Sequence, residues 1–325
     1  MTRWVRGFDG LEKADPHPAS GDASFRRYFR VHSDTASYIV MDAPPEKEDS
    51  RPFIQVAGYL ESMQLHAPRV LEADLEHGFL LLTDLGSTQY LQLLEDDAAA
   101  AEVLYASAMR ALLIIQNRGE AFQSHLPAYD AERLHFEMSL FHDWLCEKHL
   151  SIEFSDADER EWRMLCDQLV ANALEQPQVF VHRDYHSRNL MVAEDGPGIL
   201  DFQDAMEGPL TYDLVSLLKD CYVKMSADQI AKLVAEFAHD ARQLGVHDLG
   251  DEQYRRCFDL TGVQRHLKAA GIFARLNHRD GKSGYLADVP RTLSYIVDLA
   301  PDYGELGWLV DFINARVLPG LESTA

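Results

Sequence analysis

The chain has 325 residues, of which 46% are hydrophobic and 10% aromatic, a composition that allows one large core or two lobes. Its formal net charge of -23 argues against a nucleic-acid partner, because that binding depends on lysine and arginine side chains neutralising phosphates. No apolar run is long enough to span a bilayer, and the first residues lack a continuous apolar signal segment. We therefore expect a cytoplasmic globular protein with no membrane partner.

In chain order, the first predicted elements form a small sheet with one helix. Residues 24–31 and 37–41 are rich in aromatic and β-branched side chains, which favours two strands joined by a polar turn. Residues 52–64 carry apolar side chains at helical spacing. Further strands are predicted near 69–73 and 79–83, so this part of the chain is expected to form a small, mainly β lobe.

Beyond these strands the pattern becomes mainly helical. A clear case is the segment 226–245, where Ser226 and Gln229 match a capping box and Gly245 is placed to end the helix. The apolar stripe of this helix consists of Ile230, Leu233, Val234, Phe237, Ala241 and Leu244. The later part of the chain is therefore predicted to be a larger, mainly helical lobe.

The most informative segment connects two short apolar runs, 179–181 and 198–200, which are typical of buried strands. Between them the chain has the spacing H-x-D-x-x-x-x-N, with Asp184 and Asn189 at its polar positions, and Asp201 follows the second run. In phosphoryl transfer this spacing provides a carboxylate that receives a hydroxyl proton and an amide oxygen that binds magnesium. We therefore predict Asp184 as the catalytic residue, Asn189 and Asp201 as Mg2+ ligands, and ATP as the phosphoryl donor.

Two other interpretations compete with this one. Taken singly, Asp and Asn residues after apolar strands are commonly turn formers, because their side chains bond nearby backbone amides. His182 and His186 have the spacing of zinc ligands on a helix, but they flank a strand-to-loop junction and have no third ligand at a familiar spacing. The joint arrangement with Gly208-Pro209 and Tyr212-Asp213-Leu214 favours the phosphotransferase.

At these residues the chain resembles the aminoglycoside phosphotransferase and choline kinase superfamily. The resemblance covers most of the chain and implies an α+β, bilobal, protein-kinase-like fold. Its N-lobe, 1–84, would hold a small antiparallel sheet that binds nucleotide, and its mainly helical C-lobe, 85–325, would hold the catalytic loop, the metal site and the acceptor site. The run 21–31, together with 41–45, is similar to bacterial anomeric kinases that phosphorylate N-acetylmuramate and N-acetylglucosamine during cell-wall recycling.

The resemblance also implies where the nucleotide binds. The segment Thr83-Asp84-Leu85 would connect the lobes and offer backbone groups to adenine, although a plain surface turn ended by Gly86 is the alternative. Arg26, Arg27 and Arg30 form a cationic cluster that could contact the phosphates, and the alternative is that they belong to a solvated, charged strand. The remaining predicted nucleotide contacts, in the loop and strand after Gly21, are Ser24, Phe25, Arg26 and Arg30.

One departure from the family pattern concerns the phosphate-binding lysine of the small lobe. The strand 38–41 places Met41 or Asp42 near the position where relatives carry that lysine. ATP would then be held mainly by magnesium and backbone amides, or the chain would be a catalytically weak binding protein. In a third alternative a cation reaches the phosphates from elsewhere, the candidates being Arg26, Arg27, Arg30 and Lys47.

In the family the acceptor site is built by the helical lobe. The segment 275–280 is a candidate for contacts to the acceptor, and a solvated, charged loop is the alternative interpretation. Asp204 is a further candidate, but it could equally order its own loop. The candidate acceptor contacts are Gln203, Asp204, Arg275, Asn277, His278 and Arg279. Two structural roles are also implied: His182 would order the catalytic loop, and Asp213 would either cap a helix or bond the backbone of that loop.

From the resemblance we expect transfer of the ATP γ-phosphoryl group to the anomeric (C1) hydroxyl of an amino sugar such as N-acetylmuramate or N-acetylglucosamine, in peptidoglycan recycling. An aminoglycoside or a choline-like alcohol is the alternative acceptor. A protein kinase is disfavoured because no A-P-E sequence follows Asp201. A nucleotide-binding pseudokinase is compatible with the absent lysine, but the retention of Asp184, Asn189 and Asp201 argues against it. Protein partners are not predicted.

Overall fold

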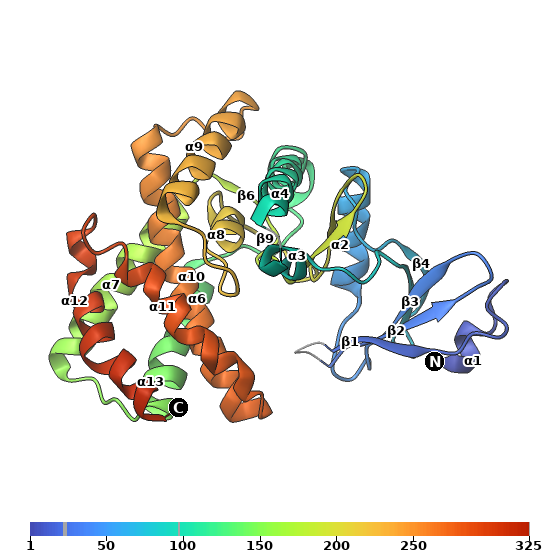
Figure 1. The fold of residues 1–325 in the computed structure, drawn as a ribbon, viewed down its shortest axis with the longest axis horizontal. Helices are drawn as coiled ribbons and strands as arrows, with labels where there is room; N and C mark the ends of the chain where they lie inside the picture. The colour runs from blue at the N-terminus through green and yellow to red at the C-terminus, as the bar shows by residue number, and fades with distance from the viewer. Residues whose placement is uncertain (22–24, 97, 325) are drawn as a thin grey trace. The chain divides into compact units, whose positions relative to one another are not determined.

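The computed structural model describes residues 1–21, 25–96 and 98–324 (Figure 1). Contacts within the chain divide it into two compact units. Unit 1 comprises Met1–Ile115 and Arg188–Ala205, and unit 2 comprises Gln116–Ser187 and Met206–Ala325. This division differs in extent from the predicted lobes, whose boundary at residues 84 and 85 stays a prediction. None of the described helices combines the length and the apolar character needed to cross a membrane.

Unit 1 is built on a five-stranded antiparallel sheet with the strand order β1-β2-β3-β5-β4. The predicted strands are confirmed as β2, β3, β4 and β5. The first strand, β1, was not predicted, because its segment H-P-A-S-G contains no β-branched residue and a register shift follows Pro18. The bounds are β1 His17–Gly21, β2 Arg27–His32, β3 Ser37–Asp42, β4 Val70–Asp74 and β5 Phe79–Thr83.

Unit 1 also contains the helices α1 and α2. The predicted helix is confirmed as α2, Arg51–Ser62, which buries Phe53, Val56, Ala57 and Leu60 on one face. The short helix α1, Thr2–Val5, buries Val5 in a cluster with Leu11 and Ala14, which precede β1, and with Val31 of β2, Val40 of β3 and Leu81 of β5. The ring of Phe53 lies 4.8 Å from that of Phe202, so α2 anchors the segment just after Asp201.

A two-stranded hairpin, β7 Leu190–Ala193 and β8 Gly196–Ile199, also belongs to unit 1. The predicted strand 198–200 is therefore confirmed, with its end one residue earlier. The space at Gly198 is tight, because an added Cβ would lie 3.0 Å from Met191 Cβ and 3.1 Å from Leu85 Cδ1, so a larger residue would require these side chains to shift. The Ile199 N–H donates to the His66 carbonyl at 2.6 Å, which ties β8 to the end of α2. Helices α3, Tyr90–Asp96, and α4, Ala98–Arg118, follow the sheet in sequence.

Unit 2 is mainly helical and contains one small antiparallel pair, β6 Gln178–Val181 with β9 Met206–Pro209. Its central element is α10, Asp251–Asp280, which packs against α6, α7, α8 and α11 and buries residues on every side (Figure 1). Together with the sheet of unit 1, this arrangement confirms the predicted α+β fold class. The other helices are α5 Glu120–Gln123, α6 Ala131–Leu140, η1 Phe141–His149, α7 Asp156–Glu175, α8 Tyr212–Leu218, α9 Ala227–Gln243, η2 Ser283–Asp288, α11 Val289–Val297, η3 Gly304–Leu306, α12 Gly307–Phe312, η4 Ile313–Val317 and α13 Leu318–Thr324.

The structure confirms the helix predicted at 226–245. The capping box between Ser226 and Gln229 is present, and Gly245 has φ +76°, so its left-handed backbone ends the helix. Leu244 was wrongly placed on the apolar stripe: it is 50% exposed, because α9 ends at Gln243 and the helical spacing stops there.

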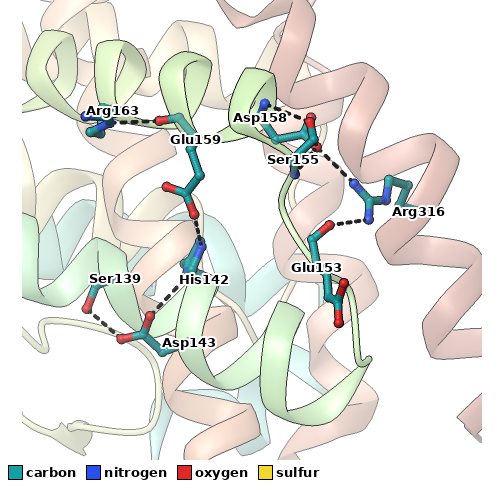
Figure 2. A network of polar contacts seen from close by, with 9 residues as sticks. All are labelled: Ser139, His142, Asp143, Glu153, Ser155, Asp158, Glu159, Arg163 and Arg316. Atoms are coloured by element: carbon teal, nitrogen blue, oxygen red, sulfur yellow. Dashed lines mark hydrogen bonds and ion pairs between the residues drawn. The ribbon is translucent and has the colours of Figure 1, made fainter.

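A polar network fastens α7 to its neighbours in unit 2 (Figure 2). On the π-helix η1, His142 lies between two carboxylates, with Nδ1 2.9 Å from Asp143 Oδ1 and Nε2 3.1 Å from Glu159 Oε1 on α7. At the start of α7, Asp158 completes the capping box with Ser155 and accepts from Arg316 Nη1 at 3.2 Å. The network therefore joins η1, α7 and η4.

Candidate active site

The catalytic loop begins where β6 ends. The carboxylate of Asp213, in the first turn of α8, accepts the backbone N–H of His182 at 2.6 Å and that of Arg183 at 2.9 Å. The N–H of Asp184 donates to His182 Nδ1 at 3.2 Å. Asp213 thus bonds the loop backbone, the second of its two proposed roles. Burial raises the pKa of Asp213, whereas the two N–H donors act in the opposite direction.

The residue before Asp184 has an uncommon backbone conformation. Arg183 has φ +78°, in the left-handed region that a non-glycine residue enters at a cost of about 1–3 kcal/mol. Its guanidinium forms a buried ion pair with Glu137 on α6. The guanidinium carbon also lies 5.3 Å from the ring centroid of Tyr129, in a cation–π contact. Tertiary contacts on both the backbone and the side chain of Arg183 therefore hold the loop in a strained form.

Asp184 lies in a strongly cationic environment within unit 2. Burial acts to raise the pKa of its carboxyl, but the charges of Lys268, His186, Arg183 and Arg265 outweigh it and lower the pKa to about 2. The side chain is half-buried. A carboxyl group must be ionised at neutral pH to act as a proton acceptor there, and the low pKa meets this condition.

The two predicted magnesium ligands lie together in unit 1. The amide Nδ2 of Asn189 is 3.5 Å from Asp201 Oδ2, and the Leu200 N–H donates to the Asn189 carbonyl at 2.9 Å. Asp201 has φ +60°, a left-handed conformation that Asp tolerates better than most residues. Gln203 Nε2 donates to Asp201 Oδ1 at 2.9 Å and so orients the carboxylate.

These residues fit a magnesium ion in chemical terms. A carboxylate and a side-chain amide are the hard oxygen donors that magnesium prefers, and turning the Asn189 amide by half a revolution presents its oxygen in place of its nitrogen. Among the candidate cations, Arg26 lies near this pair: its Nη2 is 3.7 Å from Asp201 Oδ1, and its side chain is 10% exposed.

The other cations considered for the phosphates have different partners. Arg27 forms an ion pair with Asp42 at the end of β3, and the ammonium of Lys47 lies 4.6 Å above the ring of Phe25. Met41 is fully buried in the sheet, so its position offers no polar group to a ligand. Phe25 is exposed, and Ser24 lies outside the described residues.

Two predicted nucleotide contacts bind each other. Arg30 on β2 donates to both oxygens of Asp84, at 2.6 and 3.0 Å, and to the Gly86 carbonyl at 2.7 Å. The hydrogen bond to Asp84 raises the pKa of Arg30. Thr83, at the end of β5, accepts the Arg69 N–H on its hydroxyl at 2.9 Å. The side chain of Arg30 and the backbone N–H of Arg69 thus hold the segment 83–86, which gives Arg30 and Asp84 a structural role.

The predicted acceptor residues are divided between the two units. Gln203 and the exposed Asp204 belong to unit 1, whereas Arg275, Asn277, His278 and Arg279 belong to unit 2. The segment 275–280 is not the loop of the alternative interpretation, because it forms the last turns of α10, but its residues 278–280 are exposed, as that interpretation predicted.

Helical geometry also separates the members of this set on α10. Positions 275, 278 and 279 share one side of a helix, and position 277 lies on the opposite side. His278 Nε2 is 3.1 Å from His149 Nδ1, and Arg279 forms an ion pair with Asp280 at 2.8 Å. The structure therefore does not bring Asn277 together with Arg275, His278 and Arg279 on one face.

Sequence reasoning missed three buried polar residues beside the catalytic loop, Tyr129, Glu137 and Lys268, and considered Tyr212 only as part of the Tyr212-Asp213-Leu214 motif. Glu137 and Lys268 are 3% and 8% exposed, although each is charged. A signal was present for Glu137, which occupies the same helical stripe as the apolar Leu134 and Met138. A charged residue on an apolar stripe must find a buried partner.

A second group of potential metal ligands lies on η1. Ligand atoms of His142, Asp143 and Glu147 all lie within 4.8 Å of one another in the described part of the chain. The π-helix places positions 142 and 147 one above the other, because its backbone hydrogen bonds link residues five positions apart. Hydrogen bonds from His142 to Asp143 and Glu159 account for this grouping without an ion.

An antiparallel sheet, a mainly helical C-terminal part and a loop with the spacing H-x-D-x-x-x-x-N define a kinase-like phosphotransferase. Residues 15–284 match the phosphotransferase enzyme family, and the chain belongs to this family. The resemblance to aminoglycoside phosphotransferases and choline kinases is thereby confirmed, and the chain is an enzyme.

Two relatives match nearly the whole chain. It is 47% identical over 310 residues to the N-acetylmuramate/N-acetylglucosamine kinase of Pseudomonas aeruginosa, covering 94% of this chain and 90% of that protein. It is 43% identical over 301 residues to the N-acetylmuramate/N-acetylglucosamine kinase of Pseudomonas putida, covering 91% of this chain and 88% of that protein. The structure of an ethanolamine kinase from Plasmodium vivax shares the fold, with a TM-score of 0.63, 11% identity and coverage of 98% and 86% of the two chains.

Proposed function

We propose that the protein transfers the γ-phosphoryl group of ATP to the anomeric hydroxyl of N-acetylmuramate or N-acetylglucosamine, with magnesium as cofactor. The observation that carries this proposal is the 47% identity, over 94% of the chain, to a protein named for those two sugars. Phosphorylation at C1, rather than at another hydroxyl, rests on the resemblance of 21–31 and 41–45 to anomeric kinases. The product would be a sugar 1-phosphate used in peptidoglycan recycling.

Asp184 is the residue that we assign to proton transfer. The C1 oxygen forms a bond to the γ-phosphorus while the bond from that phosphorus to the bridging oxygen of ADP breaks, and the hydroxyl proton passes to the Asp184 carboxylate. Its low pKa supports this role, because the group is ionised before the sugar binds. The hydroxyl proton is released late, as the metaphosphate-like group is transferred, so a weakly basic carboxylate is a suitable acceptor for it.

Asn189 and Asp201 are the residues that we assign to the magnesium ion. When bound, magnesium would neutralise charge on the ATP phosphates. Gln203 would keep the Asp201 carboxylate oriented through its hydrogen bond of 2.9 Å. Arg26, next to Asp201, is the cation that we assign to the phosphates in the absence of a lysine on β3.

For the acceptor we propose contacts from Gln203, Asp204 and the last turns of α10. Arg275 and Arg279 carry the charge that would suit the lactyl carboxylate of muramate. N-acetylglucosamine has no such carboxylate, so removal of these charges would affect the two sugars unequally. That difference distinguishes direct recognition of muramate from a general loss of activity.

The test is ATP consumption by the purified protein with magnesium, followed by phosphorus NMR of the product. N-acetylmuramate and N-acetylglucosamine are expected to be consumed, and the product phosphate should couple to the anomeric proton. The matched control is the methyl glycoside of N-acetylglucosamine, which lacks a free C1 hydroxyl and should give no product. Turnover of the glycoside would contradict phosphorylation at C1. Turnover of choline or an aminoglycoside alone would contradict the proposed acceptor class.

A further inference from the structure

A buried network of ionised and hydroxyl groups lies behind the catalytic loop in unit 2. Glu137 of α6 is its centre: one carboxylate oxygen accepts from Arg183, and the other accepts from Tyr129 and lies 3.5 Å from the ammonium of Lys268. Lys268 of α10 also donates to the hydroxyl of Tyr212 at 3.0 Å. The network thus connects α6, α8 and α10 to the residue that precedes Asp184.

The network acts on a strained point of the backbone. Arg183 has φ +78°, and its backbone N–H is held by Asp213 while its guanidinium is held by Glu137. Because the peptide between Arg183 and Asp184 is rigid, the backbone dihedral angles of Arg183 determine where the chain carries the Asp184 side chain. Loss of the side-chain anchor would let Arg183 relax toward the common regions of backbone conformation.

Among Glu137, Arg183 and Lys268 the positive charges outnumber the negative one, and Asp184 lies near this excess of positive charge. Arg183 and Lys268 contribute two positive charges and Glu137 one negative charge, and all three are buried. Asp184 supplies the second negative charge, with Arg265, His186 and Asp213 as the other ionisable groups that face it. Lys268 and Arg183 therefore attract the Asp184 carboxylate as well as holding Glu137.

We propose that Glu137 and Lys268 are positioning residues, which hold Arg183 in its left-handed conformation and thereby direct Asp184 toward the acceptor hydroxyl. This inference rests on the proposed function, because it takes Asp184 as the group that receives the proton. Glu137 and Lys268 act through Arg183 and Asp184, so their removal should change kcat far more than the binding of either substrate.

The test is a double-mutant cycle on kcat, with the concentration of folded enzyme measured by nucleotide binding. Lys268→Met is expected to lower kcat about 100-fold, the loss typical of a misplaced catalytic group, with little change in KM for ATP or sugar. In an Asp184→Asn background the same substitution should leave the residual kcat unchanged, because positioning has no effect once the carboxylate is absent. Equal losses in the two backgrounds would show a merely structural role and overturn the proposal.

A matched control is Lys232→Met on α9, which removes a lysine from an exposed ion pair with Glu236 and should leave kcat unchanged. If Lys268→Met does not fold, the variant Glu137→Gln/Lys268→Met removes one charge of each sign and keeps the net charge of the network. Wild-type kcat in that folded variant would overturn the proposal. Wild-type kcat in Asp184→Asn would instead overturn the role of Asp184, and the positioning proposal with it.

Discussion

The guanidinium of Arg26 lies 3.7 Å from the carboxylate of Asp201, within the unit that carries both predicted magnesium ligands. The chain is strongly acidic, and β3 contains no lysine. A cation beside the metal ligand can offset the charge of a bound polyphosphate, which the overall charge of the protein opposes. Substitution of Arg26 therefore tests the proposed role of this residue in binding the ATP phosphates.

We expect Arg26→Met to weaken the binding of MgATP about tenfold, because one charge-assisted contact is lost. Arg26→Lys should recover part of that loss, since it keeps the charge but not the bidentate geometry. Calorimetric titration with a non-hydrolysable ATP analogue measures both. Arg51→Met, at an exposed ion pair with Asp49, is the control and should bind normally. Unchanged affinity in Arg26→Met would remove Arg26 from the phosphate site.

Asp201→Asn isolates the charge of the proposed metal ligand. Asn tolerates the left-handed conformation of residue 201, so the fold is expected to be retained. Loss of the carboxylate should raise the magnesium concentration required for nucleotide binding at least tenfold, because magnesium prefers charged oxygen ligands. Titration of magnesium at a fixed nucleotide concentration measures this shift. The control is Asp195→Asn, which removes an exposed carboxylate from the turn between β7 and β8; an equal magnesium requirement in the two variants would contradict the assignment of Asp201.

Asp184→Asn should lower kcat by about 10²- to 10⁴-fold while nucleotide affinity stays within a factor of about three. The neighbouring cations lower the pKa of Asp184 to about 2, so its carboxylate is ionised throughout the neutral range. The factor by which kcat falls in the variant should therefore be the same at each pH in the neutral range. Single-turnover rates at several pH values provide the measurement. A loss that shrinks toward acidic pH would mean that Asp184 titrates there and is not held ionised by its neighbours.

Two glycines on helices provide an opposed pair of stability predictions. At Gly271 of α10 an added Cβ would overlap the backbone of Leu140 and Phe141, so Gly271→Ala should destabilise unit 2 by about 3 kcal/mol or more. At Gly58 of α2 nothing lies within 4 Å of an added Cβ, so Gly58→Ala should stabilise by about 0.5–1 kcal/mol. Denaturant unfolding of both variants measures the free energies. A Gly271→Ala variant as stable as the wild type would show that α10 does not pack as closely on α6 as described.

Several elements were predictable because their signals are local. The stripe of α2 and the capping box of α9 depend on side chains within one or two turns of each other, and β5 on a run of neighbouring apolar residues. α10 was harder to delimit, since a helix buried on every side has no polar face and hence no clear periodicity. The last turns of α10 were taken as a loop because only their charges were considered, and the final residues 278–280 are exposed.

The sequence by itself determined the class of this protein, a phosphotransferase, because the predicted catalytic residues follow a spacing that is set by two short strands and the loop between them. Only the tertiary structure decided the partners of the charged residues. Arg30 binds Asp84, Arg26 lies beside Asp201, and Glu137 joins Arg183 to Lys268, each across a long stretch of chain. Such pairs depend on the path of the backbone in space, because charges distant in sequence carry no local pattern that identifies their partners.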